Sequence, residues 1–307
     1  MHVAQVREWS EGPKYTAVDD LPAPGTTEHQ LRVLGAGIHQ VVRSRASGKH
    51  YSARTLPHTV GIDAVARDES TGKLYYCFRL QGGVFAEYIN IDKDSAIPVP
   101  DGVDPVALAA SVNPAMSSWM AITHRTSNLP GNFTVLILGA TTASGRMAVH
   151  AAKALGAGKV IGVARNEDTL KNVEGLDEYI VQKENIKDTD FSKTEPDLIL
   201  DYVYGELAVH VLESLNTRKA VQYVTIGSLS QQTVEIPSAI FRSKDITMRG
   251  AGPGAYSIPA LQMELRKLVP EMAGWKLLDA QGFDMKDIES VWGDKELAAK
   301  GRLVAIP

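Results

Sequence analysis

The first hundred residues alternate short apolar runs with turns that carry Gly, Pro or charged residues. Short apolar runs bounded by such turns are typical of β-strands. The strands expected here are residues 30–34, 64–67, 74–78 and 85–91. Residues 68–73 are polar and contain Gly72, which predicts a hairpin tip, and residues 96–102 carry two prolines that mark an exit from this region. This part of the chain is therefore predicted to be mostly β.

The periodicity changes at Pro105, after which apolar residues such as Val106, Ala109 and Ala110 fall on one face of a helix. Residues 134–138 then form a continuous apolar run, typical of a strand buried on both faces of a parallel sheet. Helix and strand patterns alternate from there, and further strands are expected at residues 159–163, 179–181, 198–200, 221–226 and 246–248. Such a series predicts a parallel, doubly wound sheet.

The tail after Gly254 reads as one helix, with Leu261, Leu265 and Leu268 on one face, and a closing strand at residues 302–306. We expect this tail to return to the β-rich part. The fold class predicted from the pattern is α/β in two domains. Their limits are residues 1–108 with 255–307 for the β-rich domain and residues 109–254 for the parallel-sheet domain.

Composition narrows the class of protein. The 307 residues carry a net charge of -4, which gives no electrostatic case for binding nucleic acid or an acidic membrane surface. No apolar run suits a signal peptide or a membrane span, so neither is expected. The single cysteine, Cys77, can form no internal disulfide and no multi-cysteine metal site. A cytoplasmic protein is the expectation that fits.

The strongest motif is the turn that follows the apolar run at residues 134–138. Small residues there let the backbone approach a pyrophosphate at a helix N-terminus. The dinucleotide fingerprint G-x-G-x-x-G is present in degenerate form, with Thr142 in place of the middle glycine, so the loop must stand off slightly or donate the Thr142 hydroxyl to phosphate. The alternative is a plain strand-to-helix turn. The expected cofactor-binding residues of this turn are Ala140, Thr141, Thr142, Ala143, Ser144 and Gly145.

The end of the next expected strand indicates which dinucleotide binds. An acidic residue there suits the ribose 2'-hydroxyl of NAD. This chain instead has Arg165 and Asn166. An arginine can hold a 2'-phosphate through two charge-assisted hydrogen bonds, so NADPH is the expected cofactor. The alternative is that Arg165 is only a solvated surface residue.

Several segments together resemble the medium-chain dehydrogenase/reductase superfamily, and within it the zinc-independent quinone oxidoreductase branch. The resemblance covers nearly the whole chain and implies a GroES-like β domain, wrapped by both termini, beside a Rossmann domain. The segments that carry it are Gly83-Val84-Phe85-Ala86-Glu87-Tyr88, Pro98-Val99-Pro100-Asp101-Gly102-Val103, residues 135–156 and Asp197-Leu198-Ile199-Leu200-Asp201-Tyr202.

The resemblance also locates the positions that hold catalytic zinc in alcohol dehydrogenases of the superfamily. They are occupied here by His39, by Ile62 with Asp63, and by Asn113. A catalytic zinc needs three protein ligands, which this set does not supply, so no metal is expected. The stretch between Asp63 and Gly82 is also shorter than in typical members.

Without zinc, the expected chemistry is hydride transfer from NADPH to an electron-poor small molecule, either a quinone or an α,β-unsaturated carbonyl compound. The resemblance places Tyr51 near that substrate as the candidate catalytic residue. It places Asn113, Tyr202, Val203, Tyr204, Gly227 and Ser228 near the nicotinamide. Two alternatives stay open, an NADPH-binding protein without turnover and a zinc-free alcohol dehydrogenase. Residues 246–248 are expected to be an edge strand through which a homodimer could form.

Overall fold

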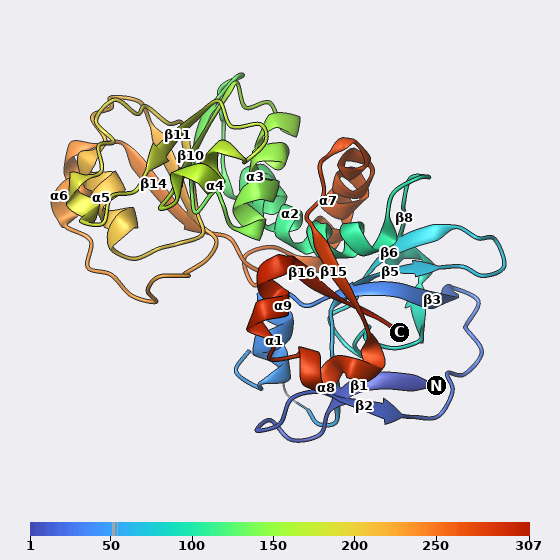
Figure 1. The fold of residues 1–307 in the computed structure, drawn as a ribbon. Helices are drawn as coiled ribbons and strands as arrows, with labels where there is room; N and C mark the ends of the chain where they lie inside the picture. The colour runs from blue at the N-terminus through green and yellow to red at the C-terminus, as the bar shows by residue number, and fades with distance from the viewer. Residues whose placement is uncertain (51–52, 54) are drawn as a thin grey trace. The chain divides into compact units, whose positions relative to one another are not determined.

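The structure is a computed structural model that describes residues 1–50, 53 and 55–307. Its contacts divide the chain into two units (Figure 1). The first unit is Met1–Asn113 with Leu265–Pro307, and the second is Pro114–Glu264. Both termini belong to the first unit. Tyr51, the candidate catalytic residue, lies outside the described residues.

The first unit consists mainly of antiparallel sheet. One sheet has the order β2-β1-β4, and a larger one has the order β15-β16-β3-β5-β6-β8, with β7 also pairing β3. The strands are β1 (His2–Val6), β2 (Lys14–Ala17), β3 (Glu28–Gly37), β4 (His58–Thr59), β5 (Asp63–Arg67), β6 (Leu74–Phe78), β7 (Tyr88–Asp92), β8 (Ala96–Pro98), β15 (Ala280–Asp284) and β16 (Arg302–Ile306). The helices are α1 (Gln40–Ala46), α8 (Ile288–Val291) and α9 (Lys295–Lys300), with 3-10 turns η1 (Lys93–Ser95), η3 (Met272–Gly274) and η4 (Met285–Asp287).

The C-terminal strand is built into this sheet, because β16 pairs antiparallel with β3, Val304 opposite Gly37. The strand expected at residues 85–91 is shorter than predicted and begins at Tyr88. Before it, Phe85 donates its N–H to the Val60 carbonyl and Ala86 forms an isolated bridge with Val3. This segment therefore changes pairing partners, which a period-two pattern does not reveal.

The second unit contains a six-stranded sheet with the order β11-β10-β9-β12-β13-β14, all parallel. In sequence order this is 3-2-1-4-5-6, the doubly wound Rossmann arrangement. The strands are β9 (Thr134–Leu138), β10 (Lys159–Ala164), β11 (Glu178–Val181), β12 (Leu198–Asp201), β13 (Val221–Thr225) and β14 (Ile246–Gly250). The helices are α3 (Ala143–Ala154), α4 (Glu167–Lys171), α5 (Glu206–Ser214) and α6 (Ser238–Ser243), with a 3-10 turn η2 (Ile186–Asp188). The predicted fold class is confirmed.

The core of the second unit lies on both faces of the sheet. Val135 and Ile137 of β9 belong to one apolar cluster, and Leu136 and Leu138 belong to the other. Because successive side chains of a strand point to opposite faces, a strand covered on both faces must be apolar throughout. This is why β9 reads as an unbroken apolar run.

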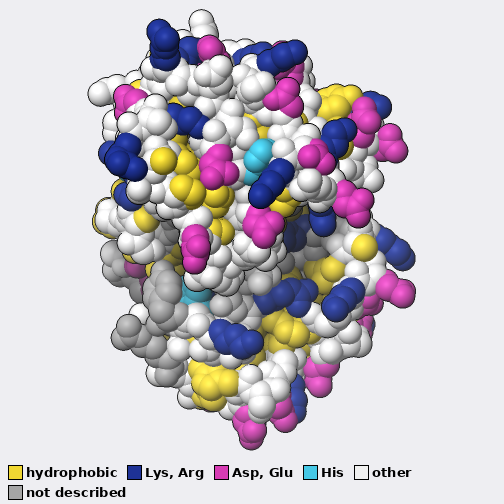
Figure 2. Space-filling model, turned by 90° about the vertical axis from the view of Figure 1, so that its left-hand side faces the viewer, with side chains coloured by type: hydrophobic (Ala, Val, Ile, Leu, Met, Phe, Trp, Pro, Cys, Tyr) yellow, Lys and Arg dark blue, Asp and Glu magenta, His cyan; other side chains and the backbone are white. Residues whose placement is uncertain are grey.

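Two helices run across the border between the units, α2 (Pro105–Arg125) and α7 (Ile258–Glu271). The helix expected to lead towards Pro114 continues through that proline to Arg125. The borders thus fall inside helices, whereas the sequence-based limits at residues 108 and 254 remain a prediction. Among the described residues no helix is long and apolar enough to cross a membrane. Acidic and basic side chains are interspersed on the face in Figure 2.

Candidate functional site

The turn after β9 lies where the strand order of the second unit reverses, between β9 and β12. Ligands of open α/β sheets bind outside the carboxyl ends of the strands at such a point. Gly139 has a φ of 88°, which favours glycine, and a Cβ at Gly145 would lie 2.2 Å from the Gly139 carbonyl oxygen. Gly145 therefore lets α3 pack closely on the turn. The tight-turn position is Gly139, one residue before the position expected from the fingerprint.

Thr142 is the N-cap of α3. Its hydroxyl accepts a hydrogen bond from the Gly145 N–H at 3.0 Å and donates one to the Gly139 carbonyl at 2.8 Å. The hydroxyl proton is thus used within the turn and not for phosphate, so the other predicted alternative, a loop that lies slightly farther from the phosphate, stays a prediction. The N–H groups of Ala143 and Ser144, in the first turn of α3, have no partner within a helix and remain the natural donors to an anion.

A cavity of about 300 Å³ opens at this edge of the sheet. Four of the residues expected to bind the cofactor at this end line it, and Gly139, Gln182 and Leu229 join them. The lining residues are Gly139, Thr141, Thr142, Val163, Ala164, Arg165, Asn166, Gln182, Val203, Leu229 and Ser230. We call this space the β10 cavity.

Arg165 is exposed at the β10 cavity. Within the part of the chain that the structure describes, its guanidinium has no hydrogen-bond or ion-pair partner. The neighbouring Asn166 caps α4, because its Oδ1 accepts the Thr169 N–H at 2.8 Å. Asn166 is therefore partly occupied by the fold, whereas Arg165 has five N–H donors available for a ligand.

A second cavity, of about 600 Å³, lies at the carboxyl ends of β13 and β14, and we call it the β14 cavity. It contains the predicted Tyr204, Gly227 and Ser228. The full lining is Arg125, Tyr204, Thr225, Ile226, Gly227, Ser228, Gln232, Gly250, Ala251, Gly252, Gly254 and Ala255. Arg125 was not among the expected residues. It donates from Nε to the Gly250 carbonyl at 2.7 Å and so holds the chain after β14.

Two expected cofactor-binding residues point into the protein instead. Tyr202 is 3% exposed, shares a hydrogen bond with the Ser118 hydroxyl of α2, and belongs to the core, where burial raises its pKa. Ala140 is fully buried in the same core cluster. Neither lines the β10 or the β14 cavity, so their side chains pack in the core and do not face a cofactor in these two cavities. In a strand-to-loop segment, alternate side chains face opposite sides, and Val203 takes the cavity side.

Asp201, at the end of β12, was also missed. It is fully buried, and its Oδ1 accepts the backbone N–H groups of Val203 and Tyr204 at 2.8 and 2.9 Å. Its Oδ2 accepts the Tyr223 hydroxyl. Burial raises the pKa of Asp201, while these hydrogen bonds lower it. The signal in the sequence was a carboxylate at the end of an otherwise apolar strand.

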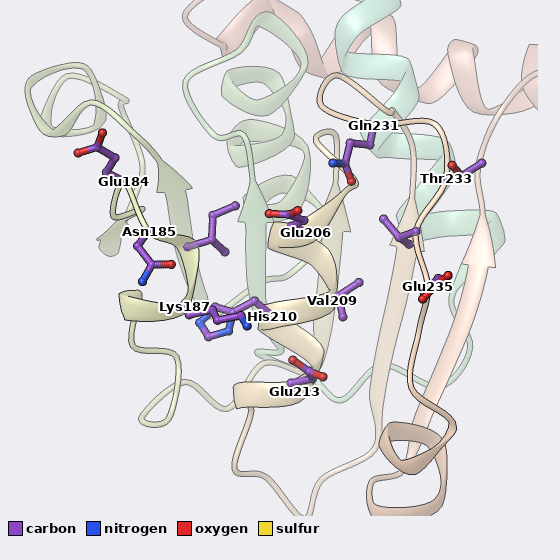
Figure 3. Close-up of a pocket in the computed structure, with 12 residues that line it drawn as sticks. Glu184, Asn185, Lys187, Glu206, Val209, His210, Glu213, Gln231, Thr233 and Glu235 are labelled. Carbon is purple, nitrogen blue, oxygen red and sulfur yellow. The ribbon is translucent and has the colours of Figure 1, made fainter.

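A third cavity, of about 530 Å³, lies along α5 and is rimmed by carboxylates. Glu206 and Glu213 come from α5, and Glu184 and Glu235 come from the segments beside it (Figure 3). Lys187 and His210 are the basic and imidazole side chains of this lining. A surface with this excess of negative charge repels phosphate groups, so the β10 and β14 cavities suit an anionic cofactor better.

In the first unit, His39 and Asp63 lie together in the core. His39 Nε2 is 3.4 Å from Asp63 Oδ2, which also accepts the Tyr76 hydroxyl at 3.0 Å. Among residues 1–50, 53 and 55–307, no three His, Cys, Asp or Glu side chains come close enough to hold a metal ion. Asn113 is the last residue of this unit, within α2, and its position at the nicotinamide end stays a prediction.

Known proteins similar to this chain have the same overall organisation. The quinone oxidoreductase of Thermus thermophilus, also crystallised with NADPH, superposes with a TM-score of 0.82 at 22% identity over all of both chains. The quinone oxidoreductase of Pseudomonas syringae pv. tomato gives a TM-score of 0.78 at 20% identity, covering 100% of this chain and 99% of that one. Identities this low establish the fold alone.

Sequence comparison goes further. No family model matches the chain. The probable NADPH-dependent quinone reductase tdiC of Emericella nidulans is 36% identical over 356 aligned positions, which cover all of both proteins. The alignment is longer than this chain, so the relative carries segments that this chain lacks. At this identity over its whole length, the chain belongs to the medium-chain dehydrogenase/reductase superfamily, in the quinone oxidoreductase-like branch.

Proposed function

We propose that the protein is an NADPH-dependent oxidoreductase that transfers hydride to a quinone without zinc. The observation that carries this is Arg165, an exposed guanidinium without a partner among the described residues, in the cavity that Thr142, the N-cap of α3, also lines. A guanidinium and a helix N-terminus at one cavity provide two separate anion sites. NADPH carries both a 2'-phosphate and a pyrophosphate.

The two cavities suit the two ends of the cofactor. In the β10 cavity, Arg165 would bind the 2'-phosphate, and the N–H groups of Ala143 and Ser144 would bind the pyrophosphate. The β14 cavity, with Gly227 and Ser228, would take the nicotinamide end. A Cβ at Gly227 would lie 2.8 Å from the Tyr202 carbonyl oxygen, so only glycine lets the loops after β13 and β12 approach in this way. Val203 and Tyr204 lie between the two ends.

NADPH supplies the hydride when bound. The quinone ring accepts it and is left with a negative oxygen, which needs one proton to become the hydroquinone. The ionisable side chains of the β10 and β14 cavities are arginines and Tyr204. The proton would come from a tyrosine hydroxyl or from water, and Tyr51 remains the candidate from the resemblance.

Zinc independence rests on the residues at the positions where relatives bind the metal. His39 and Asp63 offer two ligand side chains, and Asp63 already accepts the Tyr76 hydroxyl. A catalytic zinc needs three protein ligands and an open position. We therefore expect activity without added metal and in the presence of a chelator.

The test is NADPH oxidation, followed by absorbance, with a panel of quinones and α,β-unsaturated ketones. Turnover with quinones supports the proposal. Turnover with the ketones alone would move the substrate class to enones. Saturable NADPH binding with no turnover on either panel would favour a binding protein, and reduction of NADP by saturated alcohols would favour a zinc-free alcohol dehydrogenase.

A further inference from the structure

Asp201 is hydrogen-bonded to two loops, the one after β12 and the one after β13, whose residues line the β10 and β14 cavities. Its Oδ1 accepts the N–H groups of Val203 and Tyr204 at 2.8 and 2.9 Å. Its backbone carbonyl accepts the N–H groups of Ile226 and Gly227 at 2.8 and 3.1 Å. One residue at the end of β12 therefore holds the loop after its own strand and the loop after β13.

The residues that it holds line the cavities. Val203 lines the β10 cavity and Tyr204 lines the β14 cavity. The two N–H groups bonded to one carboxylate oxygen therefore belong to residues that line different cavities. Tyr204 also has a φ of 57°, in the left-handed region that non-glycine residues rarely adopt. Strained backbone of this kind persists only where its surroundings hold it. The bond from Tyr204 N–H to Asp201 is the visible restraint.

The two oxygens of the carboxylate have different partners. Oδ1 faces the loop, whereas Oδ2 accepts the hydroxyl of Tyr223, which is buried in the core and lines neither cavity. A charged acceptor makes stronger hydrogen bonds than a neutral one. The carboxylate thus has a loop half, Oδ1 with its bonds to Val203 and Tyr204, and a core half, Oδ2 with its bond to Tyr223. Substitutions can remove the two halves separately.

We infer that Asp201 is a positioning residue for the dinucleotide, which sets the Val203–Tyr204 backbone against the cofactor through its Oδ1. The inference rests on the proposed function, since it requires that a dinucleotide occupies the two cavities. Asp201 itself has no exposed surface and does not touch the cofactor. Its effect passes through the loop.

The experiment compares Asp201→Ala, Asp201→Asn and Tyr223→Phe in the full chain. The dissociation constant of NADPH is measured by nicotinamide fluorescence, and the melting temperature is measured for each variant. Asp201→Ala removes both halves and should weaken NADPH binding at least tenfold. Asp201→Asn keeps an acceptor oxygen for the loop and should recover most of that loss. Tyr223→Phe removes the core half alone and should leave NADPH affinity within twofold, although it lowers the melting temperature.

Asp201→Ala leaves the Tyr223 hydroxyl unpaired in the core and could fail to fold for that reason. The double variant Asp201→Ala/Tyr223→Phe removes the orphaned hydroxyl, and compared with Tyr223→Phe alone it isolates the loop half. The same tenfold loss is expected. In steady state, the KM for NADPH should rise while the KM for the quinone stays unchanged.

NADPH affinity that simply follows melting temperature across the variants would overturn the inference, because Asp201 would then be a structural residue only. Wild-type protein that binds NADPH tightly, with Asp201→Ala binding equally well, would overturn the inference and leave the proposed function standing. Wild-type protein that binds neither NADPH nor NADH would overturn both.

Discussion

We expect the exposed guanidinium of Arg165 to decide which cofactor this protein prefers. Arg165 lies at the carboxyl end of β10, where an acidic residue would instead select the unphosphorylated ribose. A hydrogen bond to a charged group contributes about 1.5–3 kcal/mol, which corresponds to a tenfold to hundredfold change in affinity at about 1.4 kcal/mol per tenfold. Arg165→Ala should therefore raise the dissociation constant of NADPH by about that factor and leave that of NADH nearly unchanged.

The matched control is Lys193→Ala, which removes an equal charge from an exposed position of the same unit that lines neither cavity. Titration by nicotinamide fluorescence measures both. If Lys193→Ala weakens NADPH binding as much as Arg165→Ala, the effect is long-range electrostatics and not a contact with the 2'-phosphate.

The contrast between Arg165 and Asp201 shows what a sequence discloses at the scale of one residue. The exposed position of Arg165 at the β10 cavity could be predicted because it depends only on the place of the residue after a strand. Asp201 was missed, and the burial of the Tyr202 side chain was not foreseen. Their roles depend on which way each side chain points once the strand ends, and that direction is fixed by the Ser118 and Tyr223 hydroxyls, both distant in sequence.

Among the elements, α3 has its N-terminus fixed by one side chain. Thr142→Ala removes the acceptor for the Gly145 N–H and the donor to the Gly139 carbonyl. Loss of such a cap costs about 1 kcal/mol, so the free energy of unfolding should fall by about this amount in a denaturant titration. Thr142→Ser keeps the hydroxyl and serves as the control. Equal losses in both variants would mean that the threonine methyl group, and not the cap, provides the stability.

The positions of helices and strands could be predicted from the local hydrophobic pattern where a segment keeps the same neighbours along its whole length. The strands β9 to β14 were predicted to within a few residues. The inner strands β9, β10 and β12 are almost entirely buried and largely apolar, as expected of parallel strands covered on both faces. The segment before β7 was not, since residues 84–87 pair with β1 and Val60 before the chain joins β3. The length of α2 was not predicted either. A proline inside a helix usually ends or kinks it, but α2 continues through Pro114.

At the scale of the whole molecule, the sheet order of the second unit leaves β14 at one edge. β14 is hydrogen-bonded to β13 on one side, and none of the other described strands pairs with it. An exposed strand edge is a template for pairing with another chain. This edge is not blunted by proline or by a lysine, and Arg249 is its only charged residue.

Pairing of two β14 edges across a two-fold axis would make a homodimer, so light scattering after size exclusion should give twice the chain mass of 33.2 kDa. Thr247 is exposed on β14, and Thr247→Lys adds a positive charge to an edge that already carries Arg249. Two such edges bring like charges together, which destabilises cross-strand pairing. The variant should therefore shift towards the monomer mass and keep its NADPH affinity. Thr233→Lys, at an exposed position outside β14, is the control. A wild-type monomer at every concentration, or a dimer unaffected by Thr247→Lys, would rule out assembly through this strand.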